Sequence, residues 1–476
     1  MPQKASYDAV IVGSGPNGMA AAIRLAQAGL SVLVLEANET FGGAARSAEF
    51  TLPGFIHDLG SAIHPLSIGS PFFRRLSLEK HGLHWVHPEF PLAHPLDRAR
   101  EAALKRSVTE TAIGLGVDGD SYVRLMSPFI TGWETLAPEV LKPILHWPRH
   151  PLQWARFGSR ALRSAASLAR GSFKDEPARA LFAGLSAHSF LALDVPGSAA
   201  FGLVLGTLAH TVGWPLPRGG AQQIANALVA HLRASGGELA PHSPVRNIDE
   251  LPLARAVLLD LTPKQVLRVA GHKLPASYRR RLERYRYGPG VFKLDYALTE
   301  AIPWQTAACR GAGTVHVGGT FSEVCASENE VASGRLPQNP FVLVAQPSIF
   351  DSTRAPLGKH TAWAYCHVPN GSAFDMTERV ENQIERFAPG FRDCVLARHK
   401  SDCHELERKN ANLIGGDING GAADLRQMVA RPVFSPKPYR TPVPGLYLCS
   451  ASTPPGGGVH GMCGFHAAEC VLKDFR

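Results

Sequence analysis

The sequence predicts an α/β fold, and three neighbouring segments near its start carry that prediction. Residues 7–12 form a short apolar run of the kind found in buried parallel strands. After a glycine-rich turn, residues 19–26 have the composition of a helix, which Gly29 is expected to end. Residues 31–35 form a second apolar strand. Together these segments make a strand–helix–strand unit of about 30 residues, from which parallel sheets are built.

A GxGxxG motif, made by Gly13, Gly15 and Gly18, joins the first strand to the first helix. The first glycine permits a tight turn, the second lets the backbone approach a pyrophosphate, and the third lets the helix pack on the strand. Amides at the helix N-terminus would face the phosphates, and Glu36 would accept hydrogen bonds from ribose hydroxyls. The sequence therefore predicts a Rossmann-type dinucleotide site whose contacts are Gly13, Gly15, Pro16, Asn17, Gly18, Glu36 and Ala37.

The later elements alternate between helical and strand-rich stretches. In chain order we expect mostly helical structure over 76–209, a helix over 222–232, a strand over 256–261, antiparallel strands over 290–370, a helix over 376–400, a strand over 445–449 and a helix from about 461. We therefore predict a discontinuous dinucleotide-binding domain and a mixed α+β substrate domain. The first comprises residues 1–75, 210–275 and 415–476, and the second comprises the helical segment 76–209 and the sheet segment 276–414.

Composition and charge exclude several classes of protein. Hydrophobic residues make up 45% of the chain and charged residues 19%, which excludes wholesale disorder. The net charge of +9 permits anionic ligands, but no Lys/Arg-rich tail or zinc-finger spacing is present, so nucleic-acid binding is not expected. None of the eight cysteines forms a CxxC pair, and residues 1–4 lead into the first strand without a signal sequence. We expect a cytoplasmic protein with free thiols.

Two further glycine-rich segments indicate a single dinucleotide with a reactive ring. Gly42 and Gly43 would bring another loop against the same ligand, which a pure NAD-binding unit does not need. No second GxGxxG motif stands between a strand and a helix, so we expect no separate NAD(P)H domain. Near the C-terminus, a strand, a glycine-rich loop and a helix start follow one another. There the amides of Met462 and Cys463 would stabilise negative charge on a reduced flavin.

These motifs resemble those of the phytoene-desaturase-related FAD oxidoreductases, in the amine-oxidase-like flavoprotein superfamily, and are nearest to the branch called pyridine nucleotide-disulfide oxidoreductase domain proteins. The resemblance covers almost the whole chain and includes residues 54–61, 214–220, 257–263, 351–356 and 415–421. It implies FAD as the cofactor, with Val245 at the adenine. The further FAD contacts that it implies are Gly42, Gly43, Ala44, Arg46, Gly60, Ser61, Ser450, Gly461, Met462 and Cys463. No Asp/Arg pair matches the one proposed as catalytic in carotenoid desaturases, which weakens the case for phytoene itself.

The resemblance implies an oxidoreductase in which FAD takes a hydride at N5 from a C–C or C–N bond of the substrate. Candidate acid–base groups are His64, His460 and His466, because they neighbour the cofactor motifs and histidine has a suitable pKa for proton transfer. A structural or orienting role is the alternative for each. No metal site is predicted, since Cys449, Cys463 and the two C-terminal histidines lack paired ligand spacing.

Two segments bear on the substrate and on membranes. Residues 195–217 contain no charged residue, but prolines and glycines interrupt them, so we expect a buried helix lining a cavity rather than a membrane span. Residues 140–174 contain several Lys and Arg residues and no acid, and they predict an amphipathic helix with a basic side. Such a helix suits peripheral membrane association, and a solvated helix packed on its own domain is the alternative.

We expect a lipophilic small-molecule substrate, of polyene or isoprenoid kind. Without a second dinucleotide site, the reduced flavin would be reoxidised by oxygen, a quinone or a carrier protein. Three alternatives stay open: a flavin-dependent isomerase or saturase, an amine oxidase, and a non-catalytic FAD-binding partner protein. The sequence does not determine the oligomeric state.

Overall fold

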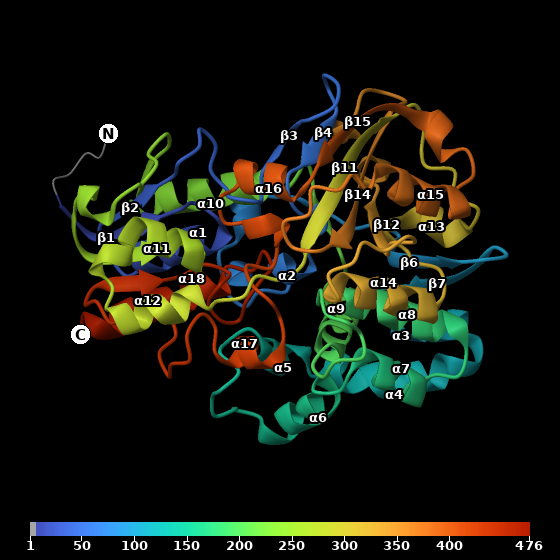
Figure 1. The fold of residues 1–476 in the computed structure, drawn as a ribbon, viewed down its shortest axis with the longest axis horizontal. Coiled ribbons are helices and arrows are strands. Elements are labelled where there is room, and N and C mark those ends of the chain that lie inside the picture. The colour runs from blue at the N-terminus through green and yellow to red at the C-terminus, as the bar shows by residue number, and fades with distance from the viewer. Residues whose placement is uncertain (1–5) are drawn as a thin grey trace.

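The computed structural model describes residues 6–476, so the N-terminal segment 1–4 lies outside the described residues. Figure 1 shows two lobes, and strand β1 and helix α18, from opposite ends of the chain, lie in the same lobe. That lobe is built on a five-stranded sheet and the other lobe on a seven-stranded sheet. The predicted α/β architecture is confirmed.

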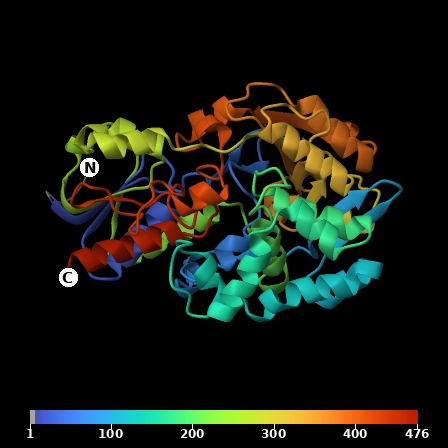
Figure 2. The same ribbon diagram turned by 60° about the horizontal axis from the view of Figure 1, so that its bottom comes forward.

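The five-stranded sheet is parallel throughout and draws its strands from three separated parts of the chain. Its order is β16-β10-β1-β2-β9. The strands are β1 (Ser6–Val12), β2 (Val32–Leu35), β9 (Glu238–Ala240), β10 (Leu253–Leu259) and β16 (Leu446–Leu448). Helix α1 (Pro16–Ala26) joins β1 to β2, and the last helix, α18 (Met462–Asp474), lies alongside it (Figure 2). A Cβ atom at Gly464 would overlap the carbonyl oxygen of Asn17, so this close approach requires glycine.

The seven-stranded sheet has the order β15-β11-β14-β13-β12-β6-β7, and its pairs are antiparallel except for β12 with β6. Its strands are β6 (Phe90–Leu96), β7 (Arg100–Leu104), β11 (Gly290–Leu298), β12 (Ala312–Val317), β13 (Val342–Ala345), β14 (His360–Val368) and β15 (Val395–Ser401). Strands β11 to β14 confirm the antiparallel sheet predicted over 290–370. Two short antiparallel pairs, β3 (Ser47–Glu49) with β4 (Ile56–Asp58) and β5 (Trp85–Val86) with β8 (Leu216–Pro217), complete the strands.

Two stretches differ from the prediction. Strands β5, β6 and β7 lie within the stretch 76–209, which we expected to be mostly helical. Strand β6 contains Pro91 and Pro95, and proline obscures a strand pattern because it cannot donate to the ladder. The helix predicted over 376–400 is α15 (Thr377–Phe387) alone. Pro389 and Gly390 follow it, and the chain then forms the edge strand β15.

Helices gather below the seven-stranded sheet in Figure 1. They are α3 (Val108–Gly114), α4 (Gly119–Thr131), α5 (Trp133–Val140), α6 (Pro151–Ala161), α7 (Ala165–Ser172), α8 (Glu176–Ala187) and α9 (Ala199–Thr211). The other helices are α2 (Pro65–Ile68), α10 (Gln222–Ala234), α11 (Pro263–Ala270), α12 (Ala276–Glu283), α13 (Ala307–Gly311), α14 (Phe321–Ala332), α16 (Cys403–Lys409) and α17 (Leu425–Val429).

The two segments singled out in the sequence both belong to this helical layer. The uncharged stretch forms the buried helix α9, and no helix within residues 6–476 is both long and apolar enough to cross a membrane. The basic stretch forms two helices, α6 and α7, instead of one. The break comes at Ser164, whose hydroxyl accepts a hydrogen bond from the Ser167 amide and so caps α7. Phe157 on α6 and Leu168 on α7 are buried, as expected for the apolar side of amphipathic helices.

Candidate functional site

A cavity of about 670 Å³ lies between the two lobes, a size typical of ligand sites. One end is lined by the glycine-rich turn after β1 and by the residues that end β2 and β10. These are the carboxyl ends of parallel strands, where α/β sheets bind their ligands. The other end is lined by apolar side chains from α9 and from the seven-stranded sheet.

The glycine-rich turn lets the backbone form one wall of the cavity. A Cβ atom at Gly15 would lie 2.6 Å from Asp260 Oδ2, and one at Gly43 would lie 2.9 Å from the Gly15 Cα atom. A side chain at Gly18 would overlap the carbonyl oxygen of Gly13, which shows why the helix packs on the strand here only with glycine. The two glycine turns therefore touch, and both backbones can face one ligand.

Glu36 ends β2 in the cavity wall and is held in place by four hydrogen bonds. The Ser14 backbone amide and hydroxyl donate to its carboxylate over 3.1 and 2.5 Å. The Asn38 backbone amide and side-chain amide donate to it over 2.9 and 2.7 Å. The two side-chain donors can rotate away, which would free acceptor positions for the hydroxyl groups of a ligand.

Asp260 is a site residue that our sequence reasoning did not single out as a ligand contact. It follows β10 beside the turn, and the Gly18 amide donates to its Oδ2 atom over 3.0 Å. Burial raises the pKa of Asp260 to about 7. Its position at the carboxyl end of a predicted strand, next to the GxGxxG strand, was the signal that could have identified it.

The structure brings most of the predicted cofactor contacts to the cavity, but not all. Those in its wall are Gly13, Gly15, Pro16, Asn17, Glu36, Ala37, Gly43, Ala44, Gly60, Ser61, Val245 and Ser450. Those outside the wall are Gly18, Gly42, Arg46, Gly461, Met462 and Cys463. Arg46 donates instead to the carbonyl oxygens of Gly43 and Lys409, over 2.7 and 2.8 Å, and so ties the second glycine turn to α16.

The three candidate histidines have different positions. His64 lines the cavity, is buried, and finds no hydrogen-bond partner for either ring nitrogen within residues 6–476. Burial lowers the pKa of His64 to about 4, so the ring is neutral. An unpartnered polar group in a cavity wall is available to a ligand.

His460 and His466 do not reach the cavity wall. The Met462 amide donates to His460 Nδ1 over 3.0 Å, so this histidine caps α18, and the amide that we expected to face a flavin is already bonded. His466 donates from Nε2 to the Leu141 carbonyl oxygen over 2.9 Å. Cys463 contacts the carbonyl oxygens of Thr453 and Gly456, and burial raises its pKa to about 11. All three side chains therefore contact other parts of the chain.

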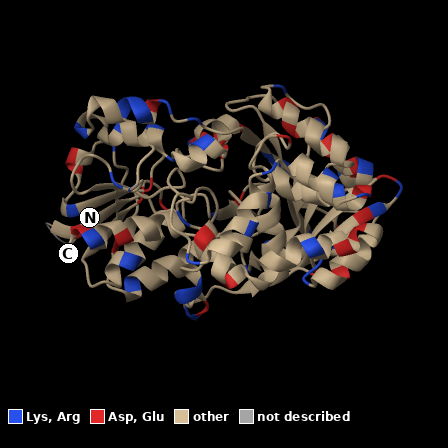
Figure 3. Ribbon diagram, turned by 90° about the horizontal axis from the view of Figure 1, so that it is seen from below, with Lys and Arg blue, Asp and Glu red and all other residues tan. Residues whose placement is uncertain are grey.

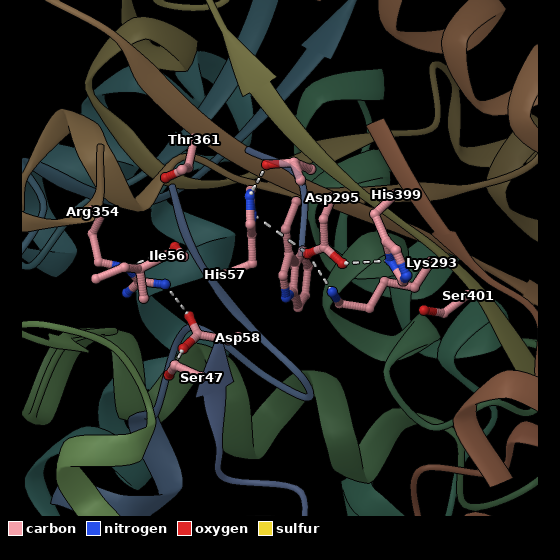
Figure 4. A network of polar contacts seen from close by, with 12 residues as sticks. Ser47, Ile56, His57, Asp58, Lys293, Asp295, Arg354, Thr361, His399 and Ser401 are labelled. Atoms are coloured by element: carbon pink, nitrogen blue, oxygen red, sulfur yellow. Dashed lines mark hydrogen bonds and ion pairs between the residues drawn. The ribbon is translucent and has the colours of Figure 1, made fainter. Parts of the chain in front are cut away.

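A buried polar network supports the cavity wall between the lobes (Figure 4). Arg354 is fully buried and pairs with Asp58 over 2.5 Å, and the Ser47 hydroxyl and the Ala221 amide also donate to Asp58. The Trp363 indole donates to the Gly60 carbonyl oxygen over 2.9 Å. These bonds hold the loop after β4, which carries Gly60, Ser61 and His64, against the seven-stranded sheet.

Lys293 is a charged residue in the cavity wall that the sequence analysis missed. It lies on β11, is buried, and pairs with Asp295 on the same strand. Burial lowers the pKa of Lys293. Burial raises the pKa of Asp295, but the Lys293 ammonium, His399 and His57 together lower it overall. His57 Nδ1 and His399 Nδ1 lie 3.8 and 3.9 Å from the same carboxylate (Figure 4).

The far end of the cavity is apolar and aromatic. Its lining includes Ile63, Leu66, Phe190, Leu205, Trp214, Val291, Leu343, Trp363, Tyr365, Leu406 and Leu413. The rings of Trp363 and Tyr365, on β14, meet edge to face with centroids 5.1 Å apart. Among residues 6–476, the carboxylates in the cavity wall are Glu36 and Asp260, both at the opposite end. A ligand would therefore meet backbone and carboxylates at one end and hydrocarbon at the other.

Comparison with known proteins gives consistent results. The family model for the NAD(P)-binding Rossmann-like domain matches residues 11–76. The chain is 27% identical to pyridine nucleotide-disulfide oxidoreductase domain-containing protein 2 of Rattus norvegicus, over 99% of this chain and 94% of that protein. It is 25% identical to the neurosporene-forming phytoene desaturase of Rhodobacter capsulatus, over 96% and 92% of the two chains.

Solved structures show the same fold. An oxidoreductase from Methanosarcina mazei superposes with a TM-score of 0.66, at 17% identity, over 98% of this chain and 99% of that one. Putrescine oxidase bound to putrescine superposes with a TM-score of 0.62, at 18% identity, over 99% of both chains. The chain thus shares the fold of these oxidoreductases and, as its motifs predicted, is similar along its whole length to the phytoene-desaturase-related proteins.

Proposed function

We propose that the protein is an FAD-dependent oxidoreductase that moves a hydride between a lipophilic substrate and the flavin. One observation carries the proposal. A single cavity joins a dinucleotide-type glycine turn to a pocket lined with apolar side chains. Such a cavity would place the reactive ring of a dinucleotide between the two lobes, where a hydrocarbon can reach it.

The residues present fit FAD. Glu36 would accept from the ribose, the backbone at Gly13 and Gly15 would approach the pyrophosphate, and Val245 would meet the adenine. The neighbouring turn at Gly43 would add a second backbone contact to the same phosphates. When bound, FAD would supply the hydride acceptor, its N5 atom.

The chain's own residues would orient the substrate and exclude water. Aromatic and aliphatic side chains from α9, β13 and β14 would hold a hydrocarbon and keep water out. His64 lines the cavity as a neutral ring and would hold a polar group of the substrate by a hydrogen bond, because burial lowers its pKa to about 4 and makes it a weak base. Lys293 would keep a positive charge in the wall, oriented by Asp295.

The charges at the apolar end disfavour a cationic substrate, and its apolar lining suits one of polyene or isoprenoid kind. Lys293 Nζ lies 5.9 Å from the Trp363 ring, and a second cation placed there would be repelled. No carboxylate of residues 6–476 lines the apolar end to pair with an ammonium group. Relatives along the whole chain include phytoene desaturases, whose names indicate a polyene hydrocarbon as substrate.

One observation favours a second candidate, an amine oxidase. The rings of Trp363 and Tyr365 both line the cavity, where an aromatic face could contact an amine, and putrescine oxidase has the same fold. A flavin-dependent isomerase or saturase and a non-catalytic FAD-binding protein remain further alternatives. In either oxidase, oxygen or a quinone would reoxidise the flavin.

Anaerobic flavin reduction distinguishes these functions. The FAD-loaded protein is mixed without oxygen with polyenes, with isoprenoid alcohols and hydrocarbons, and with primary and secondary amines, while flavin absorbance is recorded. We expect bleaching by a neutral apolar compound. Bleaching by amines alone would favour the second candidate, product formation without net bleaching would favour the isomerase, and no bleaching by any compound would favour the non-catalytic protein. Admission of oxygen or a quinone then identifies the electron acceptor by the return of absorbance.

A further inference from the structure

A second pocket, of about 880 Å³, opens among helices α4, α6, α7 and α8 and shares no lining residue with the cavity between the lobes. Its wall is rich in cations: Arg124, Arg160, Arg163, Arg170, Lys174 and Arg179. Ser121, Ser159 and Ser172 add hydroxyl groups, and no acidic residue of the described chain lines it. Guanidinium and hydroxyl groups together are the donors that phosphate groups prefer.

None of these six cations forms an ion pair within residues 6–476. Arg124 donates to the Ser121 hydroxyl over 2.8 Å, Arg163 to Ser167 over 3.0 Å, and Arg179 to the Phe173 carbonyl oxygen over 3.0 Å. Arg160 and Arg170 lie over the rings of Phe129 and Phe321. Such partners leave the positive charge uncompensated.

Two of the carboxylates that lie close to the pocket in sequence bind other groups. Asp118 is buried and accepts hydrogen bonds from the backbone amides of Lys174 and Asp175, over 2.8 and 2.7 Å. Asp175 pairs with Arg100 over 3.1 Å. The pocket therefore presents unpaired cations that an anion from outside the chain can reach.

Large apolar side chains are exposed on the segment that leads into this pocket. Trp147 and Leu152 are each 89% exposed, Leu145 is 64% exposed and Leu162 is 59% exposed. On α6, Leu152 and Arg156 lie one helical turn apart and are both exposed. Arg163, two residues after α6 ends, lines the pocket. Helix α6 lies at the lower edge of the molecule in Figure 1.

We propose that this face docks on a bilayer that contains anionic phospholipids. Trp147 and Leu152 would enter the boundary between headgroups and acyl chains, and the basic pocket would receive lipid phosphates. Exposed apolar side chains beside unpaired cations are what a surface-bound helix presents to such a membrane. Charge complementarity favours the anionic bilayer, because the pocket offers phosphate donors without a competing carboxylate. Docking does not depend on the proposed redox chemistry.

Vesicle flotation tests the docking. The full chain is mixed with vesicles of phosphatidylcholine alone, or of two parts phosphatidylcholine and one part phosphatidylglycerol, and floated through a density gradient. We expect flotation with the anionic vesicles. The triple variant Arg160→Gln/Arg163→Gln/Arg170→Gln should partition about a hundredfold more weakly, since each arginine near an anionic surface contributes about a factor of five. Trp147→Ser/Leu152→Ser should also lose binding, and tryptophan emission should shift to the blue on binding only when Trp147 is present.

A matched variant controls for net charge. Lys and Arg residues occur on helices of both lobes (Figure 3), so total charge alone could attract the vesicles. Helix α12 carries three exposed arginines, and Arg279→Gln/Arg280→Gln/Arg281→Gln removes the same charge from the other lobe. If this control weakens flotation as much as the pocket variant, the proposed face is wrong. The proposal is also overturned if no form of the protein floats, or if calorimetry shows inorganic phosphate in the pocket while anionic vesicles do not bind.

Discussion

Replacement of Asp260 with Asn should change how stability depends on pH. Asp260 is buried at the carboxyl end of β10, and burial raises its pKa from 3.8 to about 7. Near pH 5 the folded protein therefore holds a proton on this group, which the unfolded chain has released. In this range the folded state binds more protons than the unfolded state. The contribution of Asp260 to the free energy of unfolding is therefore fully present below about pH 4 and is lost as pH rises through about 7.

The size of the effect follows from that difference. Stability should fall by about 1.4 kcal/mol for each pH unit between the two pKa values, which gives a loss of about 3 kcal/mol between about pH 5 and about pH 8. Asn at this position keeps an oxygen that can accept from the Gly18 amide, and it cannot ionise. The variant should match the parent below about pH 4, and its advantage over the parent should grow by about 3 kcal/mol between about pH 5 and about pH 8.

Urea unfolding of the flavin-free protein at the two pH values measures the difference directly. Comparison of variant with parent cancels the contributions of other titrating groups. Asp8→Asn is the control: hydrogen bonds from Ser31 lower the pKa of Asp8, so it is ionised in both states and its replacement should cost the same at both pH values. A variant whose advantage does not grow with pH would refute the assignment of a proton to Asp260.

Two more predictions concern the cofactor turn and the support of the cavity wall. Gly15→Val should weaken FAD retention at least about tenfold, because its side chain would fill the space before Asp260. The flavin absorbance per chain after gel filtration measures FAD retention. Gly158→Ala is the control and should retain FAD, because no atom outside helix α6 lies within 4 Å of a Cβ atom at that position. Equal retention of FAD by both variants would contradict the site. Arg354→Met should cost about 3–5 kcal/mol in urea unfolding, because it leaves a buried carboxylate unpaired, whereas Arg286→Met breaks an exposed pair and should cost about 0–1 kcal/mol. Similar costs for the two arginines would show that the buried pair does not hold the lobes together.

The dinucleotide end of the site could be predicted from the sequence because its contacts are local. One turn supplies Gly13 and Gly15, and Glu36 follows at the end of the next strand. Strand–helix–strand geometry brings these residues together without information from elsewhere in the chain.

The substrate end could not be predicted in the same way. Lys293 and Trp363 lie on β11 and β14, and their place in the cavity wall depends on pairing between strands far apart in the sequence. A lysine within a strand gives no sign that it is buried, because its partner Asp295 is recognised only when the strand is placed.

Proximity in sequence also did not show which of the three candidate histidines line the cavity. His460 lies next to the glycine-rich loop, but Gly461 adopts a φ of +68° and turns the chain, so the histidine bonds to the start of α18 instead of facing the cavity. His466 lies in α18 and faces Leu141. The direction of α18, which the sequence does not show, keeps both of these residues out of the cavity wall. His64 belongs to the loop after β4, and this loop lines the cavity.

The absorbance spectrum of the purified protein tests the account most directly. After incubation with FAD and gel filtration, the chain should carry one flavin and show its yellow absorbance, with Gly15→Val colourless after the same treatment. A parent protein that stays colourless after this incubation would contradict the assignment of the cavity between the lobes to FAD.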